Sequence, residues 1–178
     1  NVLNCASYVA FMVSRLLLDG INEKNLILAM TATISDMMEL KSYNRILVRL
    51  GIKILNSNKN NSLWKLTNQS YIDEKVLGFD IIPKLNAYGR MMEKPVISRL
   101  VEFVLNDDST LVEEIIAVNE KRKNLLRKQI NLLPDFTDVH LIVYYKKDLK
   151  EGLVCLLAGQ LANLYHKVSI VLTDSSEN

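Results

Sequence analysis

The spacing of apolar residues changes near Pro134, and this change constrains the fold more than any other feature of the chain. Before it, residues 111–133 place apolar side chains at steps of three and four, which predicts one long α-helix. After it, residues 139–145 and 169–173 are predicted as β-strands and residues 153–165 as the helix between them. Such a unit favours parallel strands joined by a right-handed crossover. The sequence therefore predicts an α/β fold with a boundary near residue 134.

The chain before this boundary is predicted to be mainly helical. Helices are expected over residues 5–18, 44–55 and 94–105, with Gly20 capping the first of them. The apolar run 26–33 is compatible with a helix or with a buried strand, because periodicity does not separate the two. Ser109 or Thr110 is expected to cap the long helix that follows.

Composition indicates a folded chain and gives little support for a charge-driven function. With 178 residues, 49% of them hydrophobic, the chain can bury the core of one domain, or of one domain and part of another. The net charge of +2 does not by itself indicate a nucleic-acid partner. Cys5 and Cys155 are expected to be free, buried thiols in a reducing compartment. No apolar run approaches the about 20 residues of a membrane helix, so we expect a cytoplasmic protein.

Asp36 follows an apolar run, in the segment of residues 32–40 (ATISDMMEL). If that run is a strand, its end could present the Asp36 carboxylate to a metal ion at the edge of a sheet. The alternative is that Asp36 caps a helix, and Glu39, three residues later, has the spacing of a capping box. The residues alone favour the capping interpretation.

Residues 78–90 (GFDIIPKLNAYGR) mix Gly, Pro and Asn with apolar residues, and we expect no single long regular element there. Gly89 would permit a tight turn or a close backbone approach, and the guanidinium of Arg90 could bind a phosphate. Asn86 could hold this loop, and Lys84 adds positive charge. The alternative is a surface turn with solvated charges.

Basic and aromatic residues offer further, less specific candidates for nucleic-acid binding. The basic cluster could follow the phosphates of a strand or form the solvated face of a helix, and it comprises Lys121, Arg122, Lys123, Arg127 and Lys128. The aromatic candidates for stacking on bases are Trp64, Tyr88, Tyr144 and Tyr145, for most of which packing is the simpler interpretation. His140 is expected to be structural.

Several segments, taken in order, resemble one known family. They are residues 5–19 (CASYVAFMVSRLLLD), 32–55 (ATISDMMELKSYNRILVRLGIKIL), 77–91 (LGFDIIPKLNAYGRM), 119–130 (NEKRKNLLRKQI) and 151–173 (EGLVCLLAGQLANLYHKVSIVLT). The family is the RecJ-type DHH phosphoesterases. The resemblance implies that residues 1–109 are the C-terminal part of a DHH domain, that residues 110–134 are a connector helix, and that residues 135–178 begin a DHHA1 domain.

The resemblance also implies roles for individual residues. Asp36 matches a metal ligand, and Asn86, Gly89 and Arg90 match positions beside the active site and the nucleic-acid backbone. Further matches are Arg45 in the segment after Asp36, and Asn119, Arg122 and Lys123 on the connector helix. The implied activity is 5′-to-3′ exonuclease digestion of single-stranded DNA with Mn²⁺ or Mg²⁺, in DNA repair and recombination.

The chain also departs from the family pattern. It lacks the Asp-x-Asp and Asp-His-His motifs, and Glu39, Cys155, Gly159-Gln160 and Val168 replace expected family residues. One aspartate cannot hold the two metal ions of such hydrolysis, so we expect an internal fragment that is inactive alone. Two alternatives are an oligonucleotide or cyclic-dinucleotide phosphodiesterase of the same family and a non-catalytic DNA-binding scaffold.

Overall fold

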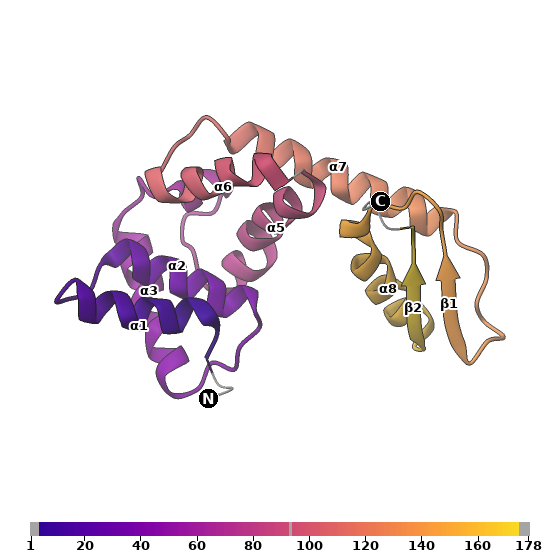
Figure 1. Cartoon of the computed structure of the whole chain (residues 1–178), viewed down its shortest axis with the longest axis horizontal. Helices are drawn as coiled ribbons and strands as arrows, with labels where there is room; N and C mark the ends of the chain where they lie inside the picture. Colours follow the sequence, from indigo (N-terminus) through magenta and orange to yellow (C-terminus); the bar gives the residue numbers. More distant parts are fainter. Residues whose placement is uncertain (1–3, 93, 175–178) are drawn as a thin grey trace.

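The protein is represented by a computed structural model that describes residues 4–92 and 94–174. Its elements, in order, are α1 (Ala6–Leu17), α2 (Glu23–Ser35), α3 (Ser42–Ser57), η1 (Ser62–Leu66), α4 (Glu74–Val76), η2 (Leu77–Ile81), α5 (Ile82–Met91), α6 (Lys94–Asn106), α7 (Val112–Asn131), β1 (Leu141–Tyr145), α8 (Glu151–Tyr165) and β2 (Val168–Leu172). Helices α1 to α6 gather toward one end of α7, and β1, α8 and β2 lie at its other end (Figure 1). The predicted α/β class is confirmed.

The ambiguous apolar run of residues 26–33 is helical and belongs to α2, which contacts both α1 and α3. Asn22 caps this helix, because its side chain accepts a hydrogen bond from the backbone N–H of Asn25 at 3.0 Å. The residues that α2 buries are Leu26, Ile27, Ala29, Met30 and Thr33. Two neighbouring helices cover α2, so its apolar residues spread beyond one stripe, which explains why the sequence pattern did not identify a helix.

The predicted helix over residues 44–55 is confirmed as α3, although its buried face differs from the expected one. Leu47 is buried as expected, whereas Ile46 and Leu50 are 56% and 43% exposed. Gly51 permits the close approach of α3 to α2, since an added Cβ would lie 2.7 Å from Sδ of Met30. Only a residue without a side chain fits at that crossing.

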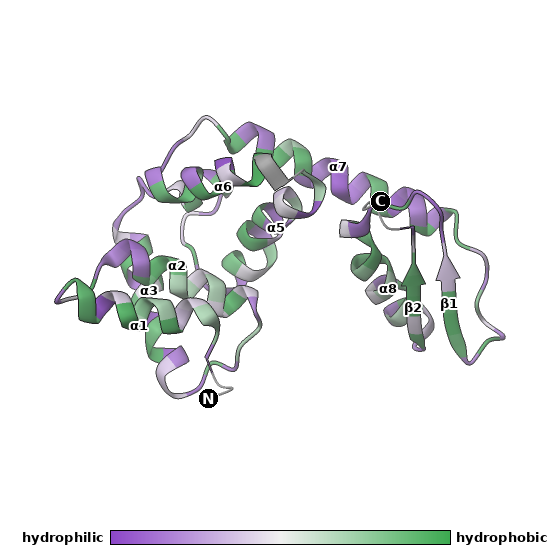
Figure 2. Ribbon diagram, in the orientation of Figure 1, coloured by the Kyte–Doolittle hydropathy of each residue, from purple (hydrophilic) through white to green (hydrophobic). Residues whose placement is uncertain are grey.

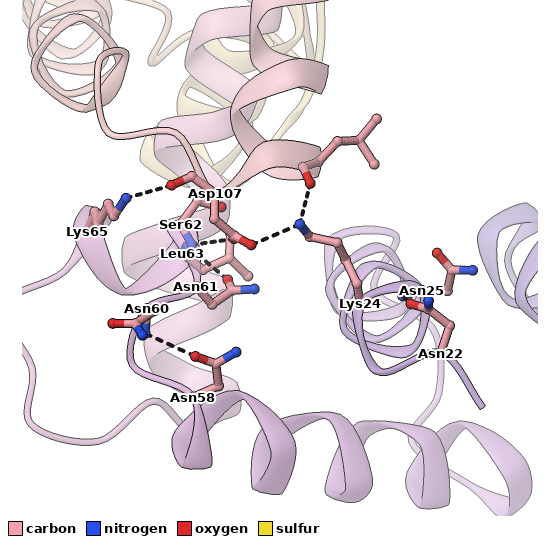
Figure 3. Close-up of polar contacts among 11 residues, drawn as sticks. Asn22, Lys24, Asn25, Asn58, Asn60, Asn61, Ser62, Leu63, Lys65 and Asp107 are labelled. Atoms are coloured by element: carbon pink, nitrogen blue, oxygen red, sulfur yellow. Dashed lines mark hydrogen bonds and ion pairs between the residues drawn. The ribbon is translucent and has the colours of Figure 1, made fainter.

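A polar network around Asp107 connects parts of the helical unit, by which we mean α1 to α6 and the first turns of α7 (Figure 3). Asp107 itself adopts a left-handed backbone conformation with φ 54°. Its carboxylate pairs with Lys24 of α2 at 2.8 Å and accepts the backbone N–H of Ser62 at 2.8 Å. Its carbonyl oxygen accepts a hydrogen bond from Lys65 at 2.6 Å. Burial opposes ionisation of Asp107, but the hydrogen bonds from Lys24 and Ser62 prevail and lower its pKa. The network therefore joins α2, η1 and the end of α6.

Residues 78–90 do not form a single regular element, as expected, but they are helical throughout and contain no loop. From Glu74 the chain is helical through α4, a π-helical turn at Leu77–Ile81, and α5. Pro83 lies in the first turn of α5, a position where proline is common, and it closely follows the π-helical turn. The irregular sequence pattern of this segment corresponds to the π-helical turn. Such turns are often found at functional sites.

The long helix predicted for residues 111–133 is confirmed as α7, and it joins two hydrophobic cores. Ile115 packs in the core of the helical unit, and Leu125 and Leu126 pack against the core beneath the sheet. Neither Ser109 nor Thr110 caps it, because the N-cap is Leu111, without a side-chain hydrogen bond.

The predicted strand–helix–strand unit is confirmed, with β1 and β2 parallel and Leu141 opposite Val168. Ile142 and Val171 face α8 and are buried. The opposite face is exposed and apolar, and it consists of Leu141, Val143, Tyr145, Val168, Ile170 and Leu172. The hydrophobic character of β2 and of the first part of β1 is visible in Figure 2.

Cys5 is buried, as expected, but Cys155 is exposed, so the expectation for this second thiol is wrong. Both are free. Within residues 4–92 and 94–174, the structure contains no helix with the length and apolarity needed to traverse a bilayer.

Candidate functional site

A cleft of about 490 Å³ lies where the end of α2, the η2–α5 helix, α7 and α8 come together. Its walls are formed by Ile34, Ser35, Met37, Met38, Leu40, Glu74, Gly78, Phe79, Ile82, Pro83, Asn86, Arg90, Arg122 and Leu156. The cleft thus brings together the segment around Asp36, the segment of residues 78–90 and the long helix, which lie far apart in the sequence. Within the described ranges, it is the place where these three predicted segments meet.

One side of the continuous helical segment formed by η2 and α5 lines this cleft along its length. Phe79, Pro83, Asn86 and Arg90 follow at steps of three and four residues, so they share one side of the helix. The wall is apolar at Phe79 and Pro83 and polar at Asn86 and Arg90. It can therefore contact an apolar group at one end and an anion at the other.

Arg122 of α7 faces the same cleft and is close to Arg90. Burial and the positive charge of Arg90 both lower the pKa of Arg122. The Nε of Arg122 is buried and has no hydrogen-bond partner among the residues that the structure describes. The two neighbouring positive charges that face one cleft favour a bound anion.

The structure places Asp36 at the C-cap of α2, so the expectation of a strand end is wrong, and so is that of a helix N-cap. Its side chain is exposed, and Ser35 and Met37, on either side of it, line the cleft. Met37 has φ 52°, which turns the chain sharply after the helix. Asn44 stabilises the segment that follows, because its buried side chain donates to the carbonyl of Glu39 at 3.1 Å.

Gly89 lies within α5 and is exposed, and an added Cβ there would meet nothing within 4 Å. The expectation of a tight turn at Gly89 is therefore wrong. Gly152 of α8 permits a close contact next to this site, because it packs directly on the backbone of Arg90. An added Cβ at Gly152 would lie 2.9 Å from the carbonyl carbon of Arg90 and closer still to its oxygen.

Three other candidate residues lie outside the cleft wall. Lys84 is largely buried and donates to Asp80 and to the carbonyl of Leu66, so its ammonium group stabilises the helix–loop packing. Lys123 pairs with Glu120 at 2.8 Å. Arg45 is exposed on the first turn of α3.

The aromatic residues proposed for base stacking have other contacts. Trp64 donates from its indole nitrogen to the carbonyl of Leu55 at 2.8 Å, and Tyr144 packs edge-to-face on Phe136. Tyr88 is fully buried, and burial together with its hydrogen bond to Glu114 raises its pKa. Tyr145 donates to Asp174 at 2.7 Å. The remaining basic residues of the cluster, Lys121, Arg127 and Lys128, are exposed.

Three residues that the sequence analysis did not select contribute to this site: Phe79, Met37 and Gly152. Phe79 and Met37 are 85% and 90% exposed, which a hydrophobicity pattern does not predict. The one available signal for Phe79 was its place next to Gly78 in the segment already selected.

The described residues do not form a metal site by themselves. Over residues 4–92 and 94–174, no three His, Cys, Asp or Glu side chains gather closely enough to hold a metal ion. A pair of hard divalent ions needs several oxygen donors, and Asp36 supplies one carboxylate.

Sequence comparison identifies relatives much longer than this chain, although no family model matches it. The single-stranded-DNA-specific exonuclease RecJ of Bacillus subtilis is 28% identical over 178 aligned residues, which cover 92% of this chain and 22% of that protein. The RecJ of Haemophilus influenzae is 28% identical over 171 residues, covering 82% of this chain and 28% of that protein. The chain therefore spans less than a third of the length of these curated relatives.

Solved structures share the fold. The crystal structure of RecJ from Thermus thermophilus in complex with Mn²⁺ matches with a TM-score of 0.78 at 22% identity, over 89% of this chain and 26% of that one. The Mg²⁺ complex of the same protein gives the same TM-score. A crystal structure of exonuclease RecJ bound to manganese matches with a TM-score of 0.73 at 21% identity, over 89% of this chain and 43% of that one.

Proposed function

We propose that this chain, which is RecJ-like in sequence and in fold, supplies one wall of the substrate cleft of a metal-dependent exonuclease that digests single-stranded DNA from 5′ to 3′. The observation that carries the proposal is the pair of arginines, Arg90 and Arg122, that face one cleft beside Asn86. In this proposal residues 1–109 belong to a DHH domain, 110–134 to a connector helix and 135–178 to a DHHA1 domain.

The two guanidinium groups bind a backbone phosphate of the strand. A phosphate oxygen accepts hydrogen bonds from these guanidinium groups and offsets the repulsion between the two positive charges. Asn86, one helical turn before Arg90, orients the same phosphate through its side-chain amide. Phosphate binding of this kind is independent of sequence, as an exonuclease requires.

Asp36 is proposed as one ligand of a Mn²⁺ or Mg²⁺ ion whose other ligands come from outside the described residues. Its exposed carboxylate at the end of α2, between two residues of the cleft wall, supports this role. When bound, the metal would supply an activated water and stabilise charge on the cleaved phosphate. The residues of this chain hold the strand beside it.

The phosphate contact is tested with Arg90→Ala, and Arg49→Ala serves as the control, since Arg49 is exposed on α3 and does not line the cleft. Binding of a short single-stranded oligonucleotide is measured by fluorescence anisotropy at several salt concentrations. We expect Arg90→Ala to weaken binding between about tenfold and a hundredfold, the loss of a charged hydrogen bond, and to reduce the salt slope by about 0.7. Equal affinities and slopes in both variants would refute the phosphate contact.

The metal role is tested with Asp36→Asn in the full-length protein, because this change preserves shape and removes the charge. We expect loss of Mn²⁺-dependent digestion and weaker Mn²⁺ binding by calorimetry. The melting temperature without metal should stay unchanged, since the Asp36 side chain is exposed. Normal Mn²⁺ affinity in this variant would exclude Asp36 as a ligand.

A further inference from the structure

Phe79 is the most unusual side chain of the cleft. It lies in the π-helical turn of Leu77–Ile81, a well-packed segment, yet it is 85% exposed. Its neighbours Leu77 and Ile81 in the same turn are both fully buried. A large aromatic side chain held in solvent by an ordered turn forgoes much of the burial energy of a folded chain, and such groups commonly contact a ligand or a partner.

The backbone fixes the position of Phe79 relative to the end of α2. An added Cβ at Gly78 would lie 3.7 Å from Cγ2 of Ile34, so the π-helical turn packs directly against the last turn of α2. Met37 follows that turn and is 90% exposed on the same cleft. Phe79 and Met37 thus form an apolar end of the cleft, and Arg90 and Arg122 form its cationic part.

We propose that Phe79 is a base-stacking residue that holds one nucleobase of a single strand whose phosphate lies at Arg90 and Arg122. A flat aromatic ring beside paired guanidinium groups is the combination that binds single-stranded nucleic acid without regard to sequence. The inference rests on the proposed function and adds to it a contact with the base.

The test compares two ligands with the same phosphates. One is an oligothymidylate and the other is an abasic strand of equal length, and both are titrated against the wild-type protein, Phe79→Ala and Phe79→Trp. Tyr71→Ala is the control, because Tyr71 is 58% exposed and lies outside the cleft wall. Thermal melting accompanies each variant.

We expect Phe79→Ala to weaken binding of oligothymidylate about fivefold to a hundredfold, the range for one stacked base, and to leave the salt slope unchanged. Binding of the abasic strand should be the same as in the wild type. Phe79→Trp should restore affinity, since a larger ring stacks at least as well. Tyr71→Ala should have no effect on either ligand.

The outcomes separate this inference from the proposal on which it rests. If Phe79→Ala binds oligothymidylate as the wild type does while Arg90→Ala does not, base stacking is refuted and the phosphate contact stands. Equal losses on both strands would refute stacking as well, because the effect would not depend on the base. If the wild-type protein binds neither strand, or Arg90→Ala changes nothing, the proposed function itself fails.

Discussion

Replacing Gly152 with Ala should displace α8 from α5 where Gly152 packs on the backbone of Arg90. The new Cβ would lie 2.9 Å from both the carbonyl carbon and the Cβ of Arg90. Carbon atoms pack best about 3.5–4.0 Å apart, so α8 must move by about 0.6–1 Å. The atoms of Arg90 that the new Cβ meets are mainly backbone atoms, which cannot rotate away. We therefore expect Gly152→Ala to lower the free energy of unfolding by about 1–3 kcal/mol.

Gly159→Ala is the matched control on the same helix. Gly159 is exposed, and an added Cβ there would meet nothing within 4 Å. Alanine in place of glycine within a helix is favourable by about 0.5–1 kcal/mol, so this control should be slightly more stable than the wild type. The difference between the two variants therefore measures the steric clash with the backbone of Arg90.

The assay combines urea unfolding with oligonucleotide binding. For a chain of this size the difference between the variants corresponds to a change in melting temperature on the order of 5 °C. Because the shift displaces the backbone of Arg90, binding of a single strand should weaken in Gly152→Ala and not in Gly159→Ala. Equal stability and equal affinity in the two variants would refute the packing of Gly152 on Arg90.

Three further predictions concern stability. Asp107→Asn should lower the free energy of unfolding by about 1 kcal/mol at neutral pH, as measured by urea unfolding. It should also reduce the loss of stability in acid. The lowered pKa of Asp107 contributes stability that is lost as the pH falls through the pKa of the folded state, and the variant lacks this contribution. Tyr88→Phe should lower the free energy of unfolding by about 1 kcal/mol, because the hydrogen bond to Glu114 is lost. It should also reduce the loss of stability above about pH 10, since the raised pKa of Tyr88 contributes stability that is lost as the pH rises. Val143 lies on the exposed face of the sheet, so Val143→Lys should change the free energy of unfolding by less than about 0.5 kcal/mol and reduce the binding of a hydrophobic dye. Ile142 is fully buried, so Ile142→Lys should prevent folding of the unit formed by β1, α8 and β2.

Most helices and both strands could be predicted because each has a local cause. Amphipathic periodicity predicted α3 and α7, and the change of period after Pro134 predicted β1 and β2. The segment of residues 26–33 could not be assigned, because burial between two helices removes the one-sided pattern. The π-helical turn at Leu77–Ile81 was missed because one extra residue in a turn has no distinct sequence signal.

The candidate site was predicted residue by residue only in part. Asn86, Arg90 and Arg122, which were selected from the sequence, line one cleft, but the helical setting of Gly89 and the ion pair of Lys84 were not foreseen. Glycine, proline and lysine have several possible roles, and the neighbours that select among these roles are distant in the sequence. Gly152 illustrates this, since its contact is 62 residues away from it along the chain, at Arg90.

The sequence by itself determined the α/β class, the long helix α7 and the parallel strand–helix–strand unit, because apolar spacing and a helix-ending proline act within a few residues. Only the tertiary structure decided which charged groups remain available in the cleft. Lys84 is held by Asp80 outside the cleft wall, whereas Arg90 and Arg122 face the cleft. The reason is physical: the availability of a charge depends on neighbours brought together by packing, and packing depends on the whole chain.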